Sequence, residues 1–322
     1  MTLKQLRYFL AIAEHGSFLK AAQSVYVAQS ALSHQIALLE QELGCELFHR
    51  SRRGVVLSEA GETLLAHART IFRQIEDAKH SIASLTDTPA GKVAFGIPHS
   101  VSNALALPLL QMVRRDLPKV QLELTEELTG NLMRQLQSGQ IHMAVLFEDG
   151  TLEEFETQPL LEESLLFIAP QELAPKKKKI DLHDALSMPL ILPAQPHGVR
   201  PIIEQAAQNY GFAKPNVVTD ISSISILRTS LLAGMGCTLL PVMPLKQEVE
   251  QGLLAAIPIT RPPLHRVVTL CRSPNIPLTS AAMSVWNACI RLVMQLSSSG
   301  QWLNSKALTG KAPSPAAHGR QE

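Results

Sequence analysis

Cysteine is scarce in this sequence, and nothing in it resembles an export or membrane signal. The four cysteines, at positions 45, 237, 271 and 289, lie far apart and form no CxxC pair, which argues against a disulfide scaffold. The chain does not open with a charged-then-apolar segment and a small-residue cleavage site. The longest tempting uncharged stretch, residues 229–245, contains two glycines and two prolines and falls short of the roughly 20 residues that span a membrane. We therefore predict a cytoplasmic protein without membrane contact.

Net charge is also nearly absent, because 29 Lys+Arg face 28 Asp+Glu and leave a formal charge of +1. A balanced chain argues against nucleic-acid binding, since a domain that binds nucleic acid is usually basic. The sum nevertheless hides a gradient, with net charges of +2 in residues 1–57, −2 in residues 58–90 and +1 in the remainder. A small basic module at the N-terminus therefore remains compatible with the composition.

Motifs of catalysis are missing as well. The sequence contains no GxSxG elbow, no P-loop, no GxGxxG after a predicted strand and no HExxH, and no two histidines are four residues apart. We predict that the chain is not an enzyme, has no catalytic residues and binds no cofactor or metal.

Residues 1–86 are predicted to be almost entirely helical. Apolar residues recur at helical spacing up to His15, and Ser17 is a suitable cap for a second helix. A short turn around Tyr26 leads into a third helix whose inward positions are Leu32, Ile36, Leu39 and Leu43. This arrangement is a helix-turn-helix, and the apolar pieces on both sides of a basic tip at residues 50–54 predict a small hairpin behind it.

The outward face of the third helix carries short polar groups that can hydrogen-bond to base edges in a major groove. Arginines of the hairpin are placed to hold phosphates or to enter the minor groove. The predicted DNA-binding residues are Ala28, Gln29, Ser30, Ser33, His34, Gln35, Arg50, Arg52 and Arg53. A merely solvated polar face is the plainer interpretation of the same helix.

A long helix capped by Ser58 follows, and its apolar residues alternate steps of four and three, as in a coiled coil. The predicted dimerisation residues are Leu64, Ala68, Ile71, Ile75, Ile82 and Leu85. We place a DNA-binding domain at residues 1–58, a linker helix at 59–88, an effector-binding domain at 89–302 and a disordered tail at 303–322.

From residue 92 onward, strands alternate with helices in two similar sets, which predicts an α/β domain with parallel sheets, two lobes and a cleft between them. Ligands of such sheets bind beyond the carboxyl ends of strands, near helix N-termini. The candidate effector-binding residues are Pro98, His99, Ser100, Val101, Ser102, Thr129, Phe147, Glu148, Pro196, His197, Gly198 and Ser222. Helix capping also explains each serine or threonine, and Glu148 leaves the charge of an effector open.

Several runs of the sequence are specific enough to name a family. GSFLKAA at residues 16–22, AQSALSHQI at 28–36, LFHR at 47–50 and LSEAG at 57–61 resemble the LysR-type transcriptional regulators. GKVAFGIPHS and LLAGMGCTLLP resemble the effector domain of that family. The tracts AQSALSHQIALLE, LLAHARTIFRQIE and MAVLFE are most similar to its nitrogen assimilation control subgroup.

The resemblance implies a winged helix-turn-helix, a dimerising linker helix and a two-lobed domain like periplasmic binding proteins. It also implies homodimers or homotetramers on double-stranded operator DNA, often with a small-molecule effector, and contact with RNA polymerase if the protein is an activator. Membership of the nitrogen subgroup would allow regulation without an effector. His142 departs from the family, which commonly has Asp there, and so it either fixes the adjacent turn differently or loosens it. A cytoplasmic small-molecule sensor without direct DNA readout remains the alternative function.

Overall fold

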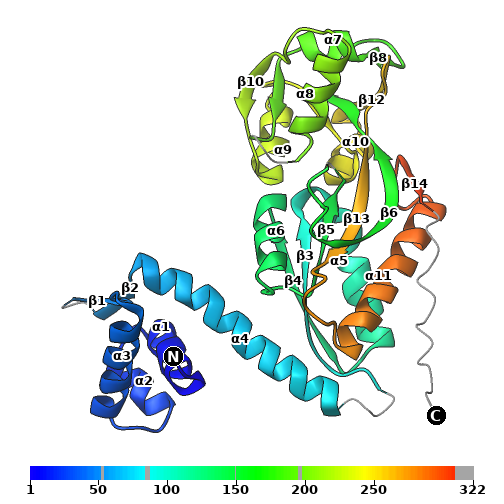
Figure 1. Ribbon diagram of the computed structural model, residues 1–322. Helices are drawn as coiled ribbons and strands as arrows, with labels where there is room; N and C mark the ends of the chain where they lie inside the picture. The colour runs from blue at the N-terminus through cyan, green and yellow to red at the C-terminus, as the bar shows by residue number, and fades with distance from the viewer. Residues whose placement is uncertain (52–53, 84–87, 149, 195–197, 309–322) are drawn as a thin grey trace. The chain divides into compact units, whose positions relative to one another are not determined.

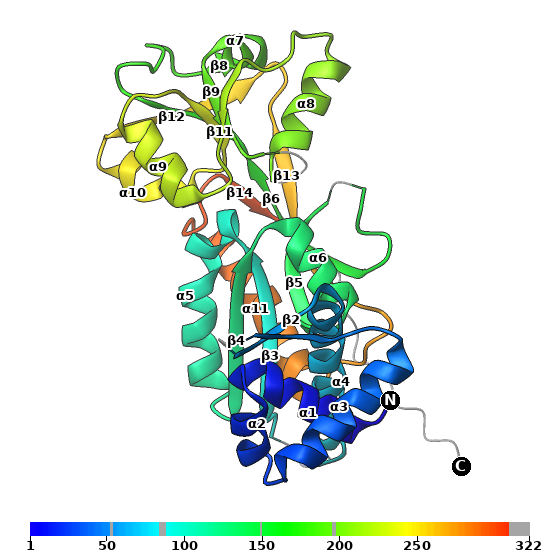
Figure 2. The same cartoon turned by 90° about the vertical axis from the view of Figure 1, so that its left-hand side faces the viewer.

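The computed structural model describes residues 1–51, 54–83, 88–148, 150–194 and 198–308, and it separates into two compact units (Figures 1 and 2). The N-terminal unit comprises residues 1–85 with 138–140, and the C-terminal unit comprises 86–137 and 141–322. Five predicted site residues lie outside the described parts of the chain, namely Arg52, Arg53, Leu85, Pro196 and His197.

The N-terminal unit contains three short helices, a hairpin and one long helix. Its elements are α1 (Leu3–His15), α2 (Phe18–Ser24), α3 (Gln29–Leu43), β1 (Phe48–Ser51), β2 (Gly54–Leu57) and α4 (Glu59–Ala83). The predicted inward positions Leu32, Ile36 and Leu39 are fully buried, whereas Leu43 is 41% exposed because it ends its helix just before Gly44. The predicted hairpin is confirmed, since β1 and β2 pair antiparallel from Phe48–Leu57 to Ser51–Gly54. The fold is therefore a helix-turn-helix followed by a wing.

Two local features fix the geometry of this unit. Tyr26 takes a left-handed backbone (φ 56°) in the turn between α2 and α3, a conformation that usually favours glycine. Ser58 caps α4 as predicted, accepting from the Gly61 N–H at 3.0 Å and donating to the Glu46 carbonyl at 2.6 Å. A Cβ added to Gly61 would lie 2.2 Å from the Leu47 carbonyl oxygen, so only glycine allows α4 to approach the chain this closely.

The apolar residues that were predicted to form a coiled-coil surface along α4 fall into two groups. Ala68 is fully buried, and Leu64 and Ile71 are partly buried against the core of α1–α3. Ile75 is partly buried and Ile82 is 73% exposed. The first group therefore stabilises its own N-terminal unit, and the second group offers the exposed apolar surface.

The C-terminal unit has two lobes, each with a sheet (Figures 1 and 2). The first lobe has the strand order β14-β6-β13-β5-β3-β4. Its elements are β3 (Gly91–Pro98), α5 (His99–Asp116), β4 (Val120–Glu127), α6 (Thr129–Gln137), β5 (Met143–Phe147), β6 (Glu156–Ser164), β13 (His265–Arg272), α11 (Ser280–Ser298) and β14 (Ser305–Ala307).

The second lobe is formed by the chain between β6 and β13. Its elements are β7 (Leu166–Pro170), β8 (Ile180–Asp181), α7 (Leu182–Ser187), β9 (Leu190–Leu192), α8 (Arg200–Asn209), β10 (Val217–Asp220), α9 (Ile224–Leu232), β11 (Thr238–Leu240), the 3-10 turn η1 (Met243–Leu245), α10 (Lys246–Glu250) and β12 (Leu254–Thr260). Strands β11-β7-β12-β8 form one sheet and β10-β9 a second, and a bridge between Leu190 and Cys237 joins them.

The expectation of parallel sheets is only partly correct. Strand β3 pairs parallel to β4 and β5, but β13 pairs antiparallel to both β5 and β6. The reason is connectivity, because β13 returns from the second lobe and enters the first sheet from the opposite end. The last strand, β14, pairs with β6, and the last helix, α11, also belongs to the first lobe, because α11 shares one core with β3 and β5.

His142 fixes the turn before β5 rather than loosening it. The imidazole ring is buried, and its Nδ1 accepts a hydrogen bond from the Ala94 backbone N–H at 2.9 Å. The backbone N–H of His142 donates to the Ala94 carbonyl at 2.9 Å. An imidazole thus ties this turn to β3 by accepting a backbone N–H at the position where the family commonly has a carboxylate.

The prediction of a disordered tail from residue 303 is wrong for the first residues of that segment. Ser305–Ala307 form β14, which pairs antiparallel with β6, and Trp302 just before it is buried. Trp302 anchors the segment in the first lobe's core, which local composition does not reveal. Residues 309–322 lie outside the described part of the chain.

Candidate functional sites

The first candidate site is the beginning of α3. Ala28, Gln29, Ser30 and His34 are exposed, and Ser33 and Gln35 are half-buried on the same helix. No side chain caps α3, and its first turn contains no acidic residue. The N-terminal turn therefore presents backbone N–H groups and short polar side chains together, a combination that suits base edges and phosphates.

The wing is the second part of this face. Arg50 lies in β1 opposite Val55, and the Val55 N–H donates to the Gly16 carbonyl at 3.0 Å. This bond ties the hairpin to the end of α1. The hairpin that carries the predicted arginines is therefore anchored to the helical core.

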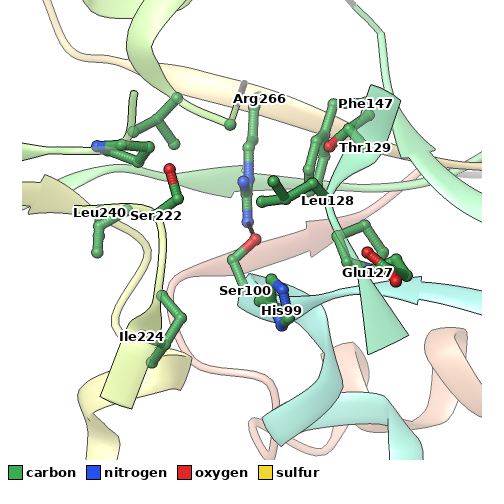
Figure 3. Close-up of a pocket in the computed structure, with 14 residues that line it drawn as sticks. His99, Ser100, Glu127, Leu128, Thr129, Phe147, Ser222, Ile224, Leu240 and Arg266 are labelled. Atoms are coloured by element: carbon green, nitrogen blue, oxygen red, sulfur yellow. Dashed lines mark hydrogen bonds between the residues drawn. The ribbon is translucent and has the colours of Figure 1, made fainter. Parts of the chain in front are cut away.

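The second candidate site is a cavity between the two lobes of the C-terminal unit (Figure 3). The first residues of α5, α6 and α9 line it together with Val199, the residue before α8, and each helix N-terminus carries a partial charge of roughly +0.5. The lining residues are Pro98, His99, Ser100, Glu127, Leu128, Thr129, Phe147, Pro193, Gly198, Val199, Ser222, Ile224, Leu240 and Arg266. Helices α5 and α8 have no side-chain cap, whereas the Ser223 side chain caps α9.

The structure brings seven of the predicted effector residues to this cavity. They are Pro98, His99, Ser100, Thr129, Phe147, Gly198 and Ser222. It does not bring three others there. Val101 is buried in the core of the first lobe. The Ser102 hydroxyl donates to the Glu126 carboxylate at 2.9 Å, away from the cavity lining. Glu148 is exposed, and its backbone N–H donates to the Val267 carbonyl. The carboxylate beside the cavity is instead Glu127.

Arg266 on β13 is the residue that sequence reasoning missed. Its guanidinium is buried and donates to Glu163 Oε1, from Nε at 2.7 Å and from Nη2 at 2.6 Å. Nη2 also donates to Ser100 Oγ at 2.9 Å, and the guanidinium carbon lies 3.8 Å from the centre of the Phe147 ring. Burial lowers the pKa of Arg266, and the neighbouring Glu163 carboxylate opposes that effect.

The third guanidinium nitrogen, Nη1, has no hydrogen-bond partner among the described residues. A buried N–H group without a partner costs about 1–3 kcal/mol. Glu163 is held from its other side, because Trp302 Nε1 donates to Glu163 Oε2 at 2.9 Å. Figure 3 shows Arg266 reaching toward Ser100 between Ser222 and Phe147. Arg266 is therefore a buried cation at the cavity wall, held in place by Glu163 and Ser100.

Some of the other missed lining residues could have been found from the sequence. Pro193 directly follows β9 and Leu240 ends β11, so the strand-end rule that selected Ser100 applies to them equally. Arg266 has no comparable local signal, because its partner Glu163 lies 103 residues away in a strand that was not predicted.

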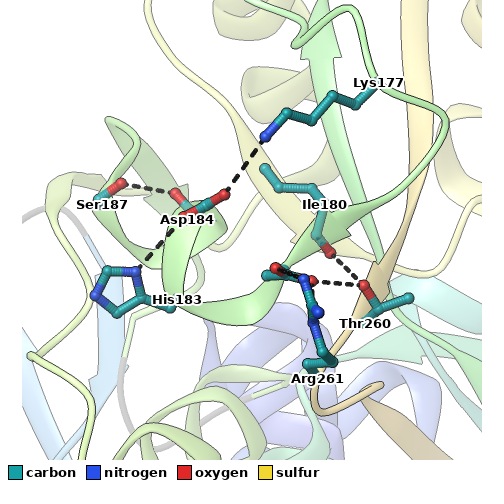
Figure 4. Close-up of polar contacts among 8 residues, drawn as sticks. Lys177, Ile180, His183, Asp184, Ser187, Thr260 and Arg261 are labelled. Carbon is teal, nitrogen blue, oxygen red and sulfur yellow. Dashed lines mark hydrogen bonds and ion pairs between the residues drawn. The ribbon is translucent and has the colours of Figure 1, made fainter.

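The four lysines at 176–179 form the remaining charged feature of the sequence. All four are exposed to solvent, and Lys177 Nζ lies 4.0 Å from Asp184 Oδ2 (Figure 4). Nearby, Arg261 Nε donates to Asp181 Oδ1 at 2.9 Å, and this hydrogen bond holds the pKa of that carboxyl below its ordinary range. These contacts belong to the second lobe and do not line the cavity.

Comparison with known proteins decides the family. Residues 3–62 match the model for the bacterial regulatory helix-turn-helix protein of the lysR family, and residues 86–293 match the LysR substrate binding domain. The chain belongs to the LysR family of bacterial transcriptional regulators. The predicted winged helix-turn-helix and two-lobed effector domain are confirmed, as is the prediction that this protein is a regulator and not an enzyme.

Individual relatives cover nearly the whole chain of this LysR-type regulator. It is 34% identical over 296 residues to the nitrogen assimilation regulatory protein nac of Klebsiella aerogenes, covering 91% of this chain and 95% of the relative. It is 30% identical over 282 residues to a hydrogen peroxide-inducible genes activator of Pectobacterium carotovorum, covering 86% and 92%. The solved structure of full-length CbnR complexed with its target DNA has a TM-score of 0.67 at 20% identity, covering 91% and 100%.

The similarity to CbnR shows a shared fold. Among the residues that the structure describes, no helix is both long and apolar enough to cross a membrane. This LysR-type regulator is a DNA-binding protein of two functional parts, and its predicted similarity to the nitrogen assimilation subgroup is supported by its relatives.

Proposed function

We propose that this LysR-type regulator reads operator DNA with the exposed start of α3 and holds the backbone with the arginines of its wing. The observation that carries the proposal is the uncapped first turn of α3, where Gln29, Ser30 and His34 are exposed together. Ser33 and Gln35 border this face, and Ala28 leaves room for close approach. Arg50, Arg52 and Arg53 supply positive charge from the hairpin.

The regulator acts in the cytoplasm as a homodimer or homotetramer, which suits operators with inverted repeats. Leu64, Ala68 and Ile71 pack within one chain, so they support the helix that presents the pairing surface. The pairing surface itself is formed by the later apolar residues of α4, where Ile82 is exposed and Ile75 half-buried.

The inter-lobe cavity is the proposed effector site, with Ser100, Thr129 and Ser222 as its hydroxyl groups. Their role is supported by their common position at one cavity although they come from different strand ends. An effector that binds both lobes shifts the balance between their arrangements and so regulates transcription.

Nitrogen metabolism is the proposed pathway, because the relative with 34% identity is a nitrogen assimilation regulator. Peroxide sensing, suggested by the name of the second relative, is less compatible with the three buried thiols of the C-terminal unit. Burial raises the pKa of Cys237 to about 11 and that of Cys289 to about 12, and it also raises the pKa of Cys271. Thiols kept protonated in this way react poorly with oxidants.

The test of DNA reading compares two glutamines of the same helix. Gln29→Ala should weaken binding to the cognate operator by about 1–3 kcal/mol, because a pair of hydrogen bonds to one base is lost. Gln41→Ala, a matched change at an exposed position near the other end of α3, should leave binding unchanged. Gel-shift titrations on the operator and on a version mutated at the contacted base pair measure both effects.

The wing serves as the contrast in the same assay. Arg52→Ala should weaken binding to all sequences and reduce the slope of log affinity against log salt by about one unit. Equal, sequence-independent binding by all three variants would refute the proposed DNA contacts. Genome-wide mapping of bound sites under nitrogen limitation and excess identifies the operator and tests the pathway.

A further inference from the structure

We propose that Tyr26, in the turn between α2 and α3, binds a phosphate of the operator backbone through its phenol hydroxyl. This inference rests on the proposed DNA-reading face at the start of α3 and adds a residue to that face. It starts from two properties of Tyr26 that the fold does not explain. The residue has a left-handed backbone with φ 56°, and it is 95% exposed.

The backbone of this turn forms a helix ending that favours glycine. The Val27 N–H donates to the Ala22 carbonyl at 3.0 Å. The Tyr26 N–H donates to the Gln23 carbonyl at 3.3 Å, and these two hydrogen bonds together define a Schellman motif. The motif requires a left-handed residue at the position of Tyr26, where glycine is the usual residue and a bulky side chain is strained.

The other two short helices of the unit end with the usual residue. Helix α1 ends at Gly16 with φ 59°, and α3 ends at Gly44 with φ 70°. The valines on either side of Tyr26 pack against the core of α1–α3, so they hold the strained turn in place. The exposed tyrosine adds almost nothing to that core. A residue that strains its own backbone without packing in the fold is explained by a partner outside the fold.

The position of Tyr26 indicates that this partner is the DNA backbone. In helix-turn-helix complexes the start of the second helix meets the base edges while the first helix crosses the backbone, and Tyr26 lies between these two helices. Its Cα is at most about 11 Å from that of Gln29, because only three residues separate them. Tyrosine is among the side chains that hydrogen-bond to phosphate oxygens, and its hydroxyl supplies one donor.

Gel-shift titrations of the full-length protein test the hydroxyl. Tyr26→Phe keeps the ring and the strained backbone, so loss of the hydroxyl alone should weaken operator binding about three- to tenfold. The loss should be equal on unrelated DNA, because a phosphate carries no sequence information. The slope of log affinity against log salt should stay unchanged, since an uncharged phenol neutralises no phosphate. Tyr210→Phe, at an exposed tyrosine of the C-terminal unit, should bind as the wild type does.

Operators with a single methylphosphonate locate the contact. This group replaces one charged phosphate oxygen by a methyl group, and each phosphate of a half-site is replaced in turn. At the phosphate that Tyr26 binds, the replacement should weaken the wild type but should not weaken Tyr26→Phe further, because the contact is already lost. At every other contacted phosphate, the two proteins should lose the same factor.

Tyr26→Gly separates the strain from the contact. Glycine takes the left-handed conformation without a steric penalty, so this variant should stabilise the N-terminal unit while it weakens operator binding at least as much as Tyr26→Phe does. Hydrogen exchange of the full-length protein without DNA measures the stability. Amides of α1 and α3 should exchange about two- to fivefold more slowly in Tyr26→Gly and at the wild-type rate in Tyr26→Phe.

Three results would overturn the inference. They are wild-type affinity of Tyr26→Phe, a loss confined to the operator or accompanied by a lower salt slope, and hydrogen exchange in Tyr26→Gly that is no slower than in the wild type. The Gln29→Ala titration keeps this inference apart from the proposed function. Its expected loss together with wild-type binding by Tyr26→Phe would reject the Tyr26 contact alone, whereas no loss in either variant would reject the DNA-reading face as well.

Discussion

The two candidate sites use polar side chains in opposite ways. On α3, Gln29, Ser30 and His34 are exposed before any partner arrives, and none of them supports the core. In the cavity, Arg266 is buried between two strands, is held by Glu163 and Ser100, and stacks on Phe147. Substitutions on the exposed face should therefore leave the fold intact, whereas the buried group contributes to the stability of the C-terminal unit.

This contrast predicts which changes affect folding and which affect only binding. The chain has two tryptophans, Trp286 and Trp302, and both lie in the core of the first lobe of the C-terminal unit. Tryptophan fluorescence therefore reports unfolding of that unit, and operator binding reports the N-terminal unit. The two readouts separate the effects of a substitution in each unit.

The largest effect is expected at the buried ion pair. Arg266→Met leaves Glu163 as an unpaired buried charge and should destabilise the C-terminal unit by about 3–5 kcal/mol. The double variant Arg266→Met with Glu163→Gln removes both charges and keeps an acceptor for Trp302, so it should regain much of that loss. Urea unfolding followed by tryptophan fluorescence measures both variants. Equal midpoints for the single and double variants would show that the charge is not the cause.

A smaller effect is expected in the N-terminal unit. Gly61→Ala places a Cβ 2.2 Å from the Leu47 carbonyl oxygen, and such overpacking costs about 1–3 kcal/mol. Operator binding should fail at a lower urea concentration, while the tryptophan transition stays where it is. Thr63→Ala, an exposed change on the same helix, serves as the control. A shift of the tryptophan transition by Gly61→Ala would contradict the separation of the two units.

The smallest effect concerns pH. The pKa of Cys237 is raised to about 11 by burial, above the value of about 8.5 expected for the unfolded chain. The folded form holds this proton more tightly, so the stabilisation is complete below about pH 8.5 and declines as pH rises toward 11. The urea concentration at the midpoint of unfolding should therefore fall as pH is raised over this range, and Cys237→Ala should make that fall less steep.

Each site could be predicted from the sequence to the extent that its contacts join residues close together in the chain. The α3 face depends on a local pattern, with Leu32, Ile36 and Leu39 inward and the polar residues between them outward, so periodicity was sufficient. The cap at Ser58 is equally local. Strand β6 was missed because its segment, residues 156–164, carries three glutamates and a proline, an unusual composition for a strand that is paired on both sides.

The cavity was predicted in part, because strand ends can be recognised locally but the pairing of strands cannot. Ser100, Thr129 and Ser222 came from the strand-end rule, and the structure brings them together. Arg266 required knowledge that β13 lies beside β6, which places it opposite Glu163 in the register. Glu148 was misplaced because it is exposed to solvent although the preceding residue, Phe147, lines the cavity.

Strand β14 has a practical consequence for handling the protein. It covers the outer edge of β6, and its residue Ser305 pairs with Glu163, the partner of Arg266. Truncation before Trp302 would expose the backbone of β6 as an open edge, which invites aggregation. It would also remove the indole that holds Glu163 in place. An affinity tag attached after Leu308 leaves β14 intact, so a tag should follow this strand and not replace it.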